Sequence, residues 1–342
     1  MDRKTKGVPK IGVALSGGGV RGLAHLGVLQ ILEEAEIPVD VIAGTSMGGI
    51  VAGLYAAGIS VEELIEFSKR TGIVDVASPD RRWRGLLGHK KMAALLADLL
   101  GREDVTFEEL NIPAAVVAAD VETGELVVLD KGPLIPALMA TSAVPIVFSP
   151  VYHQGRWLVD GGVLNNFPVD IVRRMGAERV LGVKVPPSVK LSLEDEEKGR
   201  GLSPRGLRFF GNRTHDWKLP FLIAEVSLGI TIRVVSQTRL MLCPPDVLLE
   251  IHLPNVGIFT SDDNARIIEA GRKVAGSHVA ELVKLKTRPL PPRWWRRLRS
   301  TTSRLRRAWA AFQEPEYPLY PRDQSSSRSN RRSSSTSSNS SR

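Results

Sequence analysis

Cysteine is almost absent from this 342-residue sequence, and long apolar runs are absent altogether. Cys243 is the one cysteine, which excludes a disulfide framework within the chain and suits a reducing compartment. No stretch approaches the roughly 18 uninterrupted apolar residues of a membrane span. The basic start, residues 1–10, leads into an apolar run that Gly17-Gly18-Gly19 soon interrupts. We therefore expect a cytoplasmic protein without a signal peptide. The 43% of hydrophobic residues suffices for one large domain or two small ones.

Net positive charge is absent from most of the chain and concentrated at its end. Residues 286–342 hold 14 Lys and Arg against 3 acidic residues, a net charge of +11, so the remaining 285 residues carry −2. Over residues 290–312, Trp and Leu recur at helical spacing among arginines, which is typical of a helix lying in a membrane interface. Beyond Pro321 the chain is mainly Ser, Arg and Asn, and we expect it to be disordered.

The stretch 39–58 predicts a strand, a sharp turn and a helix. An apolar run over 39–43 meets Gly44-Thr45-Ser46-Met47-Gly48 and then a small-residue run compatible with a helix. This is the pattern of a nucleophile elbow, with Ser46 as the candidate nucleophile. Gly44 and Gly48 leave room for the strained turn, and the helix start directs amide groups at the site. An ordinary glycine-rich helix start is the alternative, because the motif is short.

A second glycine-rich turn precedes the elbow. Residues 11–15 read as a strand leading into SGGGVRG at 16–22, and the leucines that follow predict a helix ending near Glu36. The result is a β-α-β unit with parallel strands, which would place both turns at the carboxyl edge of the sheet. Gly17, Gly18 and Gly19 can present consecutive N–H groups to an oxyanion.

The rest of the body alternates apolar strands with helices. Ser60 and Glu63 form a capping box for a helix ending near Arg70. Residues 80–91 read as a solvated loop or a mobile flap, and 186–241 as an insertion with one helix near 221–240. Periodicity predicts further helices and strands: helices at 91–100, 134–142, 169–175 and 262–285, and strands at 114–120, 125–129, 179–185 and 247–253.

Asp160 ends another strand that runs into glycines, RWLVDGG at 156–162. Acyl transfer needs a nucleophile, a base and donors for the oxyanion. Asp160 could act as the base directly, or a histidine could do so in a triad with it, namely His252 or His278. His252 lies within a predicted strand and His278 within a predicted helix, which favours structural roles for both. His25 follows the first glycine-rich turn and either lines the pocket or packs beneath it.

Two nucleotide-binding motifs also overlap with the glycine-rich turns. Gly17-x-Gly19-x-x-Gly22 after a strand fits a dinucleotide fingerprint, with Asp40 as the ribose partner. Asp40 precedes its strand rather than ending it, which counts against that interpretation. A phosphate-binding P-loop is excluded because no Lys follows Gly48 or Gly49.

Three blocks, GGGVRG at 17–22, GTSMG at 44–48 and DGG at 160–162, resemble the patatin-like phospholipase family in order and spacing. ATSAVP at 140–145 is similar to small bacterial members, and the resemblance covers about 11–285. It implies a three-layer α/β/α sandwich with a mostly parallel sheet. It also implies a Ser-Asp dyad without a metal or organic cofactor, with Ser46 as nucleophile and Asp160 as base. The implied oxyanion hole and supporting residues are Gly17, Gly18 and Gly19, then Arg21, Gly22, Gly44, Gly48, Gly161 and Gly162.

These features predict a serine acyl hydrolase, and the resemblance implies lipid esters, phospholipids or lysophospholipids, as its substrates. Residues 290–312 would attach it peripherally to an anionic membrane on the inner face. An Arg-rich tail also fits nucleic-acid or partner binding, but the ordered aromatic spacing favours lipid. We divide the chain into a basic start at 1–10, a catalytic domain at 11–285 with an insertion or lid at 186–241, a basic amphipathic segment at 286–321, and a disordered end at 322–342.

Overall fold

The computed structural model describes residues 9–71, 78–79, 87–186, 215–254, 256 and 264–287. The chain divides into two units, residues 1–292 and 293–342, and every described residue belongs to the first. The loop predicted at 80–91 is described only from residue 87, and the predictions for the amphipathic segment at 290–312 and the polar end lie outside the described residues.

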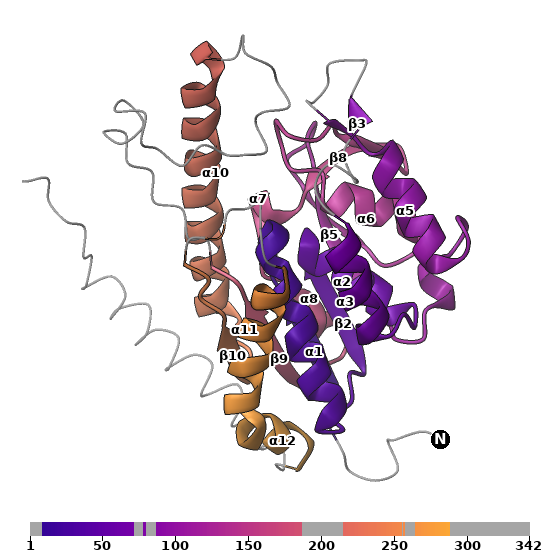
Figure 1. The fold of residues 1–342 in the computed structure, drawn as a ribbon, viewed down its shortest axis with the longest axis vertical. Coiled ribbons are helices and arrows are strands. Elements are labelled where there is room, and N and C mark those ends of the chain that lie inside the picture. The colour runs from indigo at the N-terminus through magenta and orange to yellow at the C-terminus, as the bar shows by residue number, and fades with distance from the viewer. Residues whose placement is uncertain are drawn as a thin grey trace, which may run out of the picture. The chain divides into compact units, whose positions relative to one another are not determined.

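A mixed sheet of eight strands forms the centre of the described part (Figure 1). Five neighbours, in the order β10-β9-β1-β2-β5, are parallel, while β6 and β8 run antiparallel to β5 and β7 pairs with β8. A separate short pairing joins β3 and β4. The strands are β1 (Ile11–Leu15), β2 (Val41–Thr45), β3 (Ser78–Pro79), β4 (Leu87–Gly88), β5 (Ala114–Asp120), β6 (Leu126–Leu129), β7 (Val151–His153), β8 (Arg156–Asp160), β9 (Arg179–Lys184) and β10 (Val247–Glu250).

Helices cover both faces of this sheet. The α-helices are α1 (Ala24–Glu34), α2 (Met47–Ala56), α3 (Val61–Arg70), α5 (Lys90–Leu100), α6 (Leu134–Thr141), α7 (Gly162–Asn165), α8 (Val169–Arg174), α10 (His215–Leu242), α11 (Asn264–Ser277) and α12 (Val279–Thr287), with 3-10 turns η2 (Gly19–Leu23) and η3 (Phe107–Glu109). One core joins α1, α2, α3, α5, α6, α11 and α12 to the sheet, and a second joins α8 and the end of α10 to the opposite face. The predicted three-layer α/β/α sandwich is therefore confirmed.

The alternation of side chains along the strands explains the two cores. In β1, Val13 and Leu15 face the first core and Ala14 faces the second, and all three are fully buried. In β2, Ile42 faces the first core and Ala43 the second. Parallel strands covered on both faces need apolar residues at every position, and these uninterrupted apolar runs supply them.

Most predicted elements lie within two residues of the observed ones, and the exceptions are given below. The Ser60 capping box is confirmed, with the Glu63 amide donating to Ser60 Oγ at 3.2 Å. The single closing helix predicted at 262–285 is wrong, because α11 and α12 are separated at His278, whose Nδ1 lies 2.8 Å from the Val274 carbonyl. The helix of the insertion is longer than predicted, and the short elements β7 and α7 were not anticipated because they span only three and four residues.

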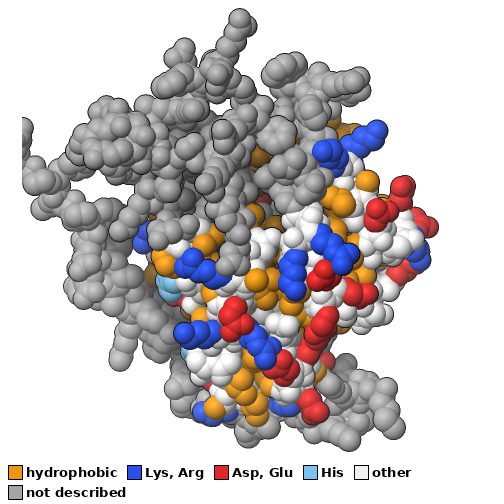
Figure 2. All heavy atoms as spheres, in the orientation of Figure 1, with side chains coloured by type: hydrophobic (Ala, Val, Ile, Leu, Met, Phe, Trp, Pro, Cys, Tyr) orange, Lys and Arg blue, Asp and Glu red, His pale blue; other side chains and the backbone are white. Residues whose placement is uncertain are grey.

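Charged side chains of both signs are interspersed on the face drawn in Figure 2. Several form ion pairs, including Arg272 with Glu34 at 2.6 Å and Arg102 with Glu109 at 2.8 Å. This mixture agrees with the small net charge of residues 1–285. Among the described helices, none has the length and apolar character needed to cross a bilayer.

Candidate active site

Ser46 occupies a strained turn between β2 and α2. Its backbone has φ 55° and ψ −129°, a region that a non-glycine residue rarely occupies and that marks functional turns. The close approach of the two elements requires glycine on both sides. A Cβ on Gly44 would collide with the Gly48 carbonyl, and a Cβ on Gly48 would lie 2.5 Å from the Ser16 carbonyl oxygen. The strand, turn and helix pattern predicted from the sequence is thus formed.

The register of β5 explains why Ser46 meets Asp160. Strand β6 pairs with Val116–Ala119, so it occupies one edge of β5 along that whole stretch. The other edge is therefore shared: β2 ends at Thr45 opposite Val117, and β8, running the other way, ends at Asp160 opposite Ala118. Two strands approach each other head-on along one edge of β5, and their carboxyl ends bring Ser46 and Asp160 together.

Ser46 directly follows the carboxyl end of β2, and Asp160 is the last residue of β8. The two strands run in opposite directions, because β2 is parallel to β5 and β8 is antiparallel to it. Gly161 continues from Asp160 directly over β5, where a Cβ would collide with the Val117 carbonyl. The turn after Asp160 thus requires glycine because of close backbone contact.

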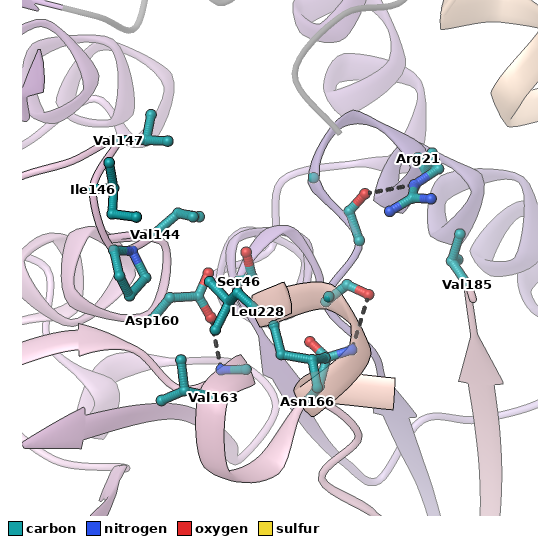
Figure 3. Close-up of a pocket in the computed structure, with 17 residues that line it drawn as sticks. Arg21, Ser46, Val144, Ile146, Val147, Asp160, Val163, Asn166, Val185 and Leu228 are labelled. Carbon is teal, nitrogen blue, oxygen red and sulfur yellow. Dashed lines mark hydrogen bonds between the residues drawn. The ribbon is translucent and has the colours of Figure 1, made fainter. Parts of the chain in front are cut away.

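Asp160 is a buried carboxylate beside the Ser46 side chain (Figure 3). Burial raises its pKa to about 6, while hydrogen bonds from the Ser46 hydroxyl and the Gly162 amide partly oppose the rise. The Gly162 amide donates to Asp160 Oδ1 at 2.8 Å. A carboxylate whose pKa lies near neutrality is a stronger base than an ordinary aspartate. Its buried environment therefore makes Asp160 a better base than it would be with an unshifted pKa.

The end of α6 fixes the backbone of both residues. Thr141 Oγ1 accepts a hydrogen bond from the Ser46 amide at 3.0 Å and donates to the Val117 carbonyl. Two residues on, the Ala143 carbonyl accepts from the Asp160 amide at 2.9 Å. One segment thus holds the nucleophile turn and the end of β8 at once. The sequence drew attention to this segment, but no spacing rule identified Thr141 as a hydrogen-bond partner of Ser46.

The backbone amides of the glycine loop, Gly17 to Gly19, have two different roles. The Gly17 amide donates to the Asn166 carbonyl at 3.0 Å, and Asn166 Nδ2 donates back to the Gly17 carbonyl at 3.4 Å. The predicted contribution of the Gly17 amide to an oxyanion hole is therefore corrected, because that amide is already occupied. Gly18 and Gly19 line the cavity, and their amides have no acceptor among the described residues. Gly19 has φ 59°, which favours glycine.

Arg21 and Gly22 attach this loop to its surroundings. The Arg21 guanidinium is buried and donates to the Gly18 carbonyl at 3.1 Å (Figure 3). It also donates to the Pro186 carbonyl at 3.4 Å. A Cβ on Gly22 would lie 2.8 Å from Met47 Cβ, so glycine lets η2 approach α2. Both residues therefore set the position of the glycine loop relative to Ser46.

Ser46 and Asp160 lie in a cavity of about 90 Å³, which we call the Ser46 cavity. Its walls are mainly apolar and come from the 144–147 loop, Val163 and, on α10, Leu228 and Ile232. Ile146 in that loop is 49% exposed and has φ 72°, a strained value for a β-branched residue. An apolar cavity around a serine and a raised-pKa carboxylate suits the reacting end of an acyl chain.

Neither of the two histidines considered for a triad lines the Ser46 cavity, and His25 does not line it either. His25 is fully buried beneath the loop and donates from Nε2 to the Ser16 carbonyl at 2.8 Å, and burial lowers its pKa to about 4. His278 lies between α11 and α12, with its Nδ1 2.8 Å from the Val274 carbonyl. His252 lies in a neighbouring cavity. The geometry therefore favours Asp160 as the group that acts directly on Ser46.

The position of Asp40 removes the dinucleotide interpretation. Its carboxylate accepts from the Ile11 amide at 2.7 Å, at the amino end of β1. The glycine loop lies at the other end of the same strand. Asp40 therefore cannot bind a ribose placed at that loop.

Comparison with known proteins agrees with this geometry. Residues 13–173 match the model of the patatin-like phospholipase family, a range that includes the glycine loop, Ser46 and Asp160. Over these residues the chain is similar to the patatin-like phospholipase family.

Curated relatives share this region. Uncharacterized NTE family protein Rv1063c of Mycobacterium tuberculosis is 34% identical over 192 residues, which is 55% of this chain and 52% of that protein. Lysophospholipase NTE1 of Mycosarcoma maydis is 30% identical over 181 residues, 51% of this chain and 10% of that protein. The chain thus matches about half of the length of the mycobacterial protein and a small part of the fungal one. Among solved structures, VipD from Legionella pneumophila aligns with a TM-score of 0.46 and 13% identity, covering 80% of this chain and 67% of that one.

Proposed function

We propose that this protein is a serine acyl hydrolase that cleaves fatty-acyl esters of phospholipids or lysophospholipids. The observation that carries the proposal is Ser46 in a strained elbow beside the buried Asp160, whose pKa is raised to about 6, in an apolar cavity. The match of residues 13–173 to the family model and the name of the fungal relative support a lipid ester as the substrate.

In the proposed mechanism, Ser46 Oγ attacks the ester carbonyl while its proton passes to the Asp160 carboxylate. The amides of Gly18 and Gly19 donate to the resulting oxyanion. When the tetrahedral intermediate collapses, the ester C–O bond breaks and Asp160 returns the proton to the leaving alkoxide. Water then attacks the acyl-enzyme with Asp160 again as base, which releases the fatty acid and restores Ser46.

Hydrolysis of p-nitrophenyl butyrate and of a lysophospholipid by the full chain tests this proposal. We expect Ser46→Ala and Asp160→Asn to lose at least about 10³-fold in kcat on both substrates. His278→Ala should keep wild-type rates, and His252→Ala should keep them on the p-nitrophenyl ester. Activity that survives Ser46→Ala would contradict the mechanism, and loss of p-nitrophenyl ester hydrolysis in His252→Ala would point to a triad.

We further propose that residues 290–312 attach the enzyme to anionic membranes. The arginines and the regularly spaced Trp and Leu residues of that segment support this. Sedimentation with vesicles rich in anionic lipid should be lost when residues 290–342 are deleted. If vesicle binding remains while binding to RNA is lost, the tail is a nucleic-acid-binding segment instead.

A further inference from the structure

A second cavity lies beside the Ser46 cavity, between α10 and the ends of β9 and β10. Its volume is about 320 Å³, at the lower end of the roughly 300–1,000 Å³ found for ligand pockets. Asn166, Val185 and Ile232 line both cavities, so the two are neighbours across these three side chains. We call the second one the α10–β10 cavity.

An unsatisfied hydroxyl lies in the wall of the α10–β10 cavity. Ser236 on α10 is 4% exposed, and its Oγ has no hydrogen-bond partner among the described residues. Leaving a buried hydroxyl unpaired is unfavourable, because its hydrogen bonds to water are lost and not replaced. A ligand with an acceptor oxygen in the cavity would remove that penalty, since the Ser236 hydroxyl could donate to it.

The charges around the cavity favour an anion. Four titratable groups line it: Lys184, Arg233, Glu250 and His252. Glu250 is paired with Lys184 at 2.7 Å, which neutralises the one acidic group. Arg233 is exposed and lines the cavity, and no ion pair among the described residues involves it. Arginine matches the oxygens of a phosphate with several donors at once.

The two cavities fit the two ends of one substrate. An acyl chain in the apolar Ser46 cavity places the ester carbonyl at Ser46. The alcohol part of the ester then extends past Asn166, Val185 and Ile232 toward the α10–β10 cavity. In a glycerophospholipid the phosphate follows the ester oxygen after two or three carbons. Such a short spacing suits two cavities that are direct neighbours.

We propose that the α10–β10 cavity binds the phosphate of the substrate head group through Arg233, Ser236 and His252. This inference rests on the proposed function, because it assumes that Ser46 cleaves the ester. It assigns the preference for phosphate-bearing esters to α10 and β10, beyond residues 13–173 that match the family model.

The direct test compares two substrates that differ only in the phosphate, palmitoyl lysophosphatidic acid and monopalmitoylglycerol, in neutral detergent micelles. Arg233→Gln should lower kcat/KM for the phosphate substrate at least about tenfold, because the variant loses charge-assisted hydrogen bonds to the phosphate. The same variant should hydrolyse monopalmitoylglycerol within about twofold of wild type. Ser236→Ala and His252→Gln should show the same selectivity with a smaller loss.

Lys273→Gln on α11 is the matched control, because Lys273 is exposed and does not line either cavity. It removes the same charge and should leave both substrates unaffected. Equal losses on both substrates in Arg233→Gln, or no loss on the phosphate substrate, would overturn the proposal.

A binding measurement separates this inference from the proposed function. Calorimetric titration of full-length Ser46→Ala with sn-glycerol 3-phosphate should give binding that Arg233→Gln weakens at least tenfold, without any catalysis. Tighter binding of glycerophosphate than of inorganic phosphate would support a head-group site. Equal binding of the two, or binding unchanged in Arg233→Gln, would contradict it. Wild type that hydrolyses neither ester while glycerophosphate still binds would defeat the proposed function alone.

Discussion

The Ser46 cavity and the α10–β10 cavity differ in where their residues lie along the chain. The reactive groups, the glycine loop and the 144–147 loop all fall within residues 13–173 that match the family model. The α10–β10 cavity is lined mainly by residues after 173, on β9, α10 and β10. Helix α10 also reaches the Ser46 cavity, at Leu228, Gly229 and Ile232. The chemistry of ester cleavage and the choice of substrate are thus assigned to separate stretches of sequence.

The largest effect should come from Asp160, and it should not depend on the substrate. Asp160→Asn keeps the shape of the side chain but removes the base, so kcat should fall by about 10³-fold or more on every ester. Rates on p-nitrophenyl butyrate, monopalmitoylglycerol and palmitoyl lysophosphatidic acid check this. A loss confined to one of them would show that catalysis and selectivity are not separated as described.

Thr141 should have the next largest effect, again without substrate preference. Thr141→Val removes the acceptor for the Ser46 amide and should lower kcat about 10–100-fold with little change in KM. A misplaced nucleophile slows the chemical step but leaves substrate binding unchanged. Thr141→Ser, which keeps the hydroxyl, should recover most of the rate. If the serine variant is as slow as the valine variant, the hydrogen bond is not the cause.

The pH profile should follow Asp160. Because its pKa is raised to about 6, the carboxylate is available as a base only above that pH. We expect kcat/KM to fall about tenfold per pH unit below pH 6 on a neutral ester. A profile flat down to pH 4.5 would show that another group accepts the proton.

The same shift predicts a change in stability. The folded pKa of about 6 exceeds the ordinary value of 3.8, so the folded state binds the proton more tightly and stability falls as the pH rises from about 4 through 6. Above pH 6 the raised pKa of Asp160 lowers the free energy of unfolding by about 3 kcal/mol. Asp160→Asn should therefore be more stable than wild type at pH 8 and similar to it near pH 4. Urea unfolding at the two pH values measures the difference, and a variant less stable at pH 8 would contradict it.

The smallest effect should come from the part of α10 that lines the Ser46 cavity. Leu228→Trp narrows that cavity from the α10 side, so we expect a several-fold loss on a palmitoyl ester and little change on a butyryl ester. Leu228→Met, close in volume, serves as the control. Equal losses on both chain lengths would mean that α10 does not contact the acyl chain.

Local sequence patterns predicted the elements that carry the reactive residues. Ser46 follows a strand and precedes a helix, and the glycines on either side of it allow the two elements to approach closely. Asp160 ends a strand, and Gly161 after it allows a similarly close approach to β5. The head-on meeting of β2 and β8 could not be predicted, because it depends on which edge of β5 each strand occupies. The engagement of the Gly17 amide by Asn166 was missed for the same reason, since the two residues are brought together by tertiary packing. Thr141 bonds to a residue 95 positions away, and nothing in its local pattern indicates that partner.

Covalent labelling tests the central claim most directly. The full chain treated with an alkyl fluorophosphonate should gain one adduct, located by peptide mass spectrometry on Ser46. Labelling should slow below pH 6 and fall at least about 10²-fold in Asp160→Asn, because the nucleophile then lacks its base. An adduct on another residue, or an Asp160→Asn variant that is labelled at the wild-type rate, would contradict the assignment of Ser46 and Asp160 as the catalytic pair.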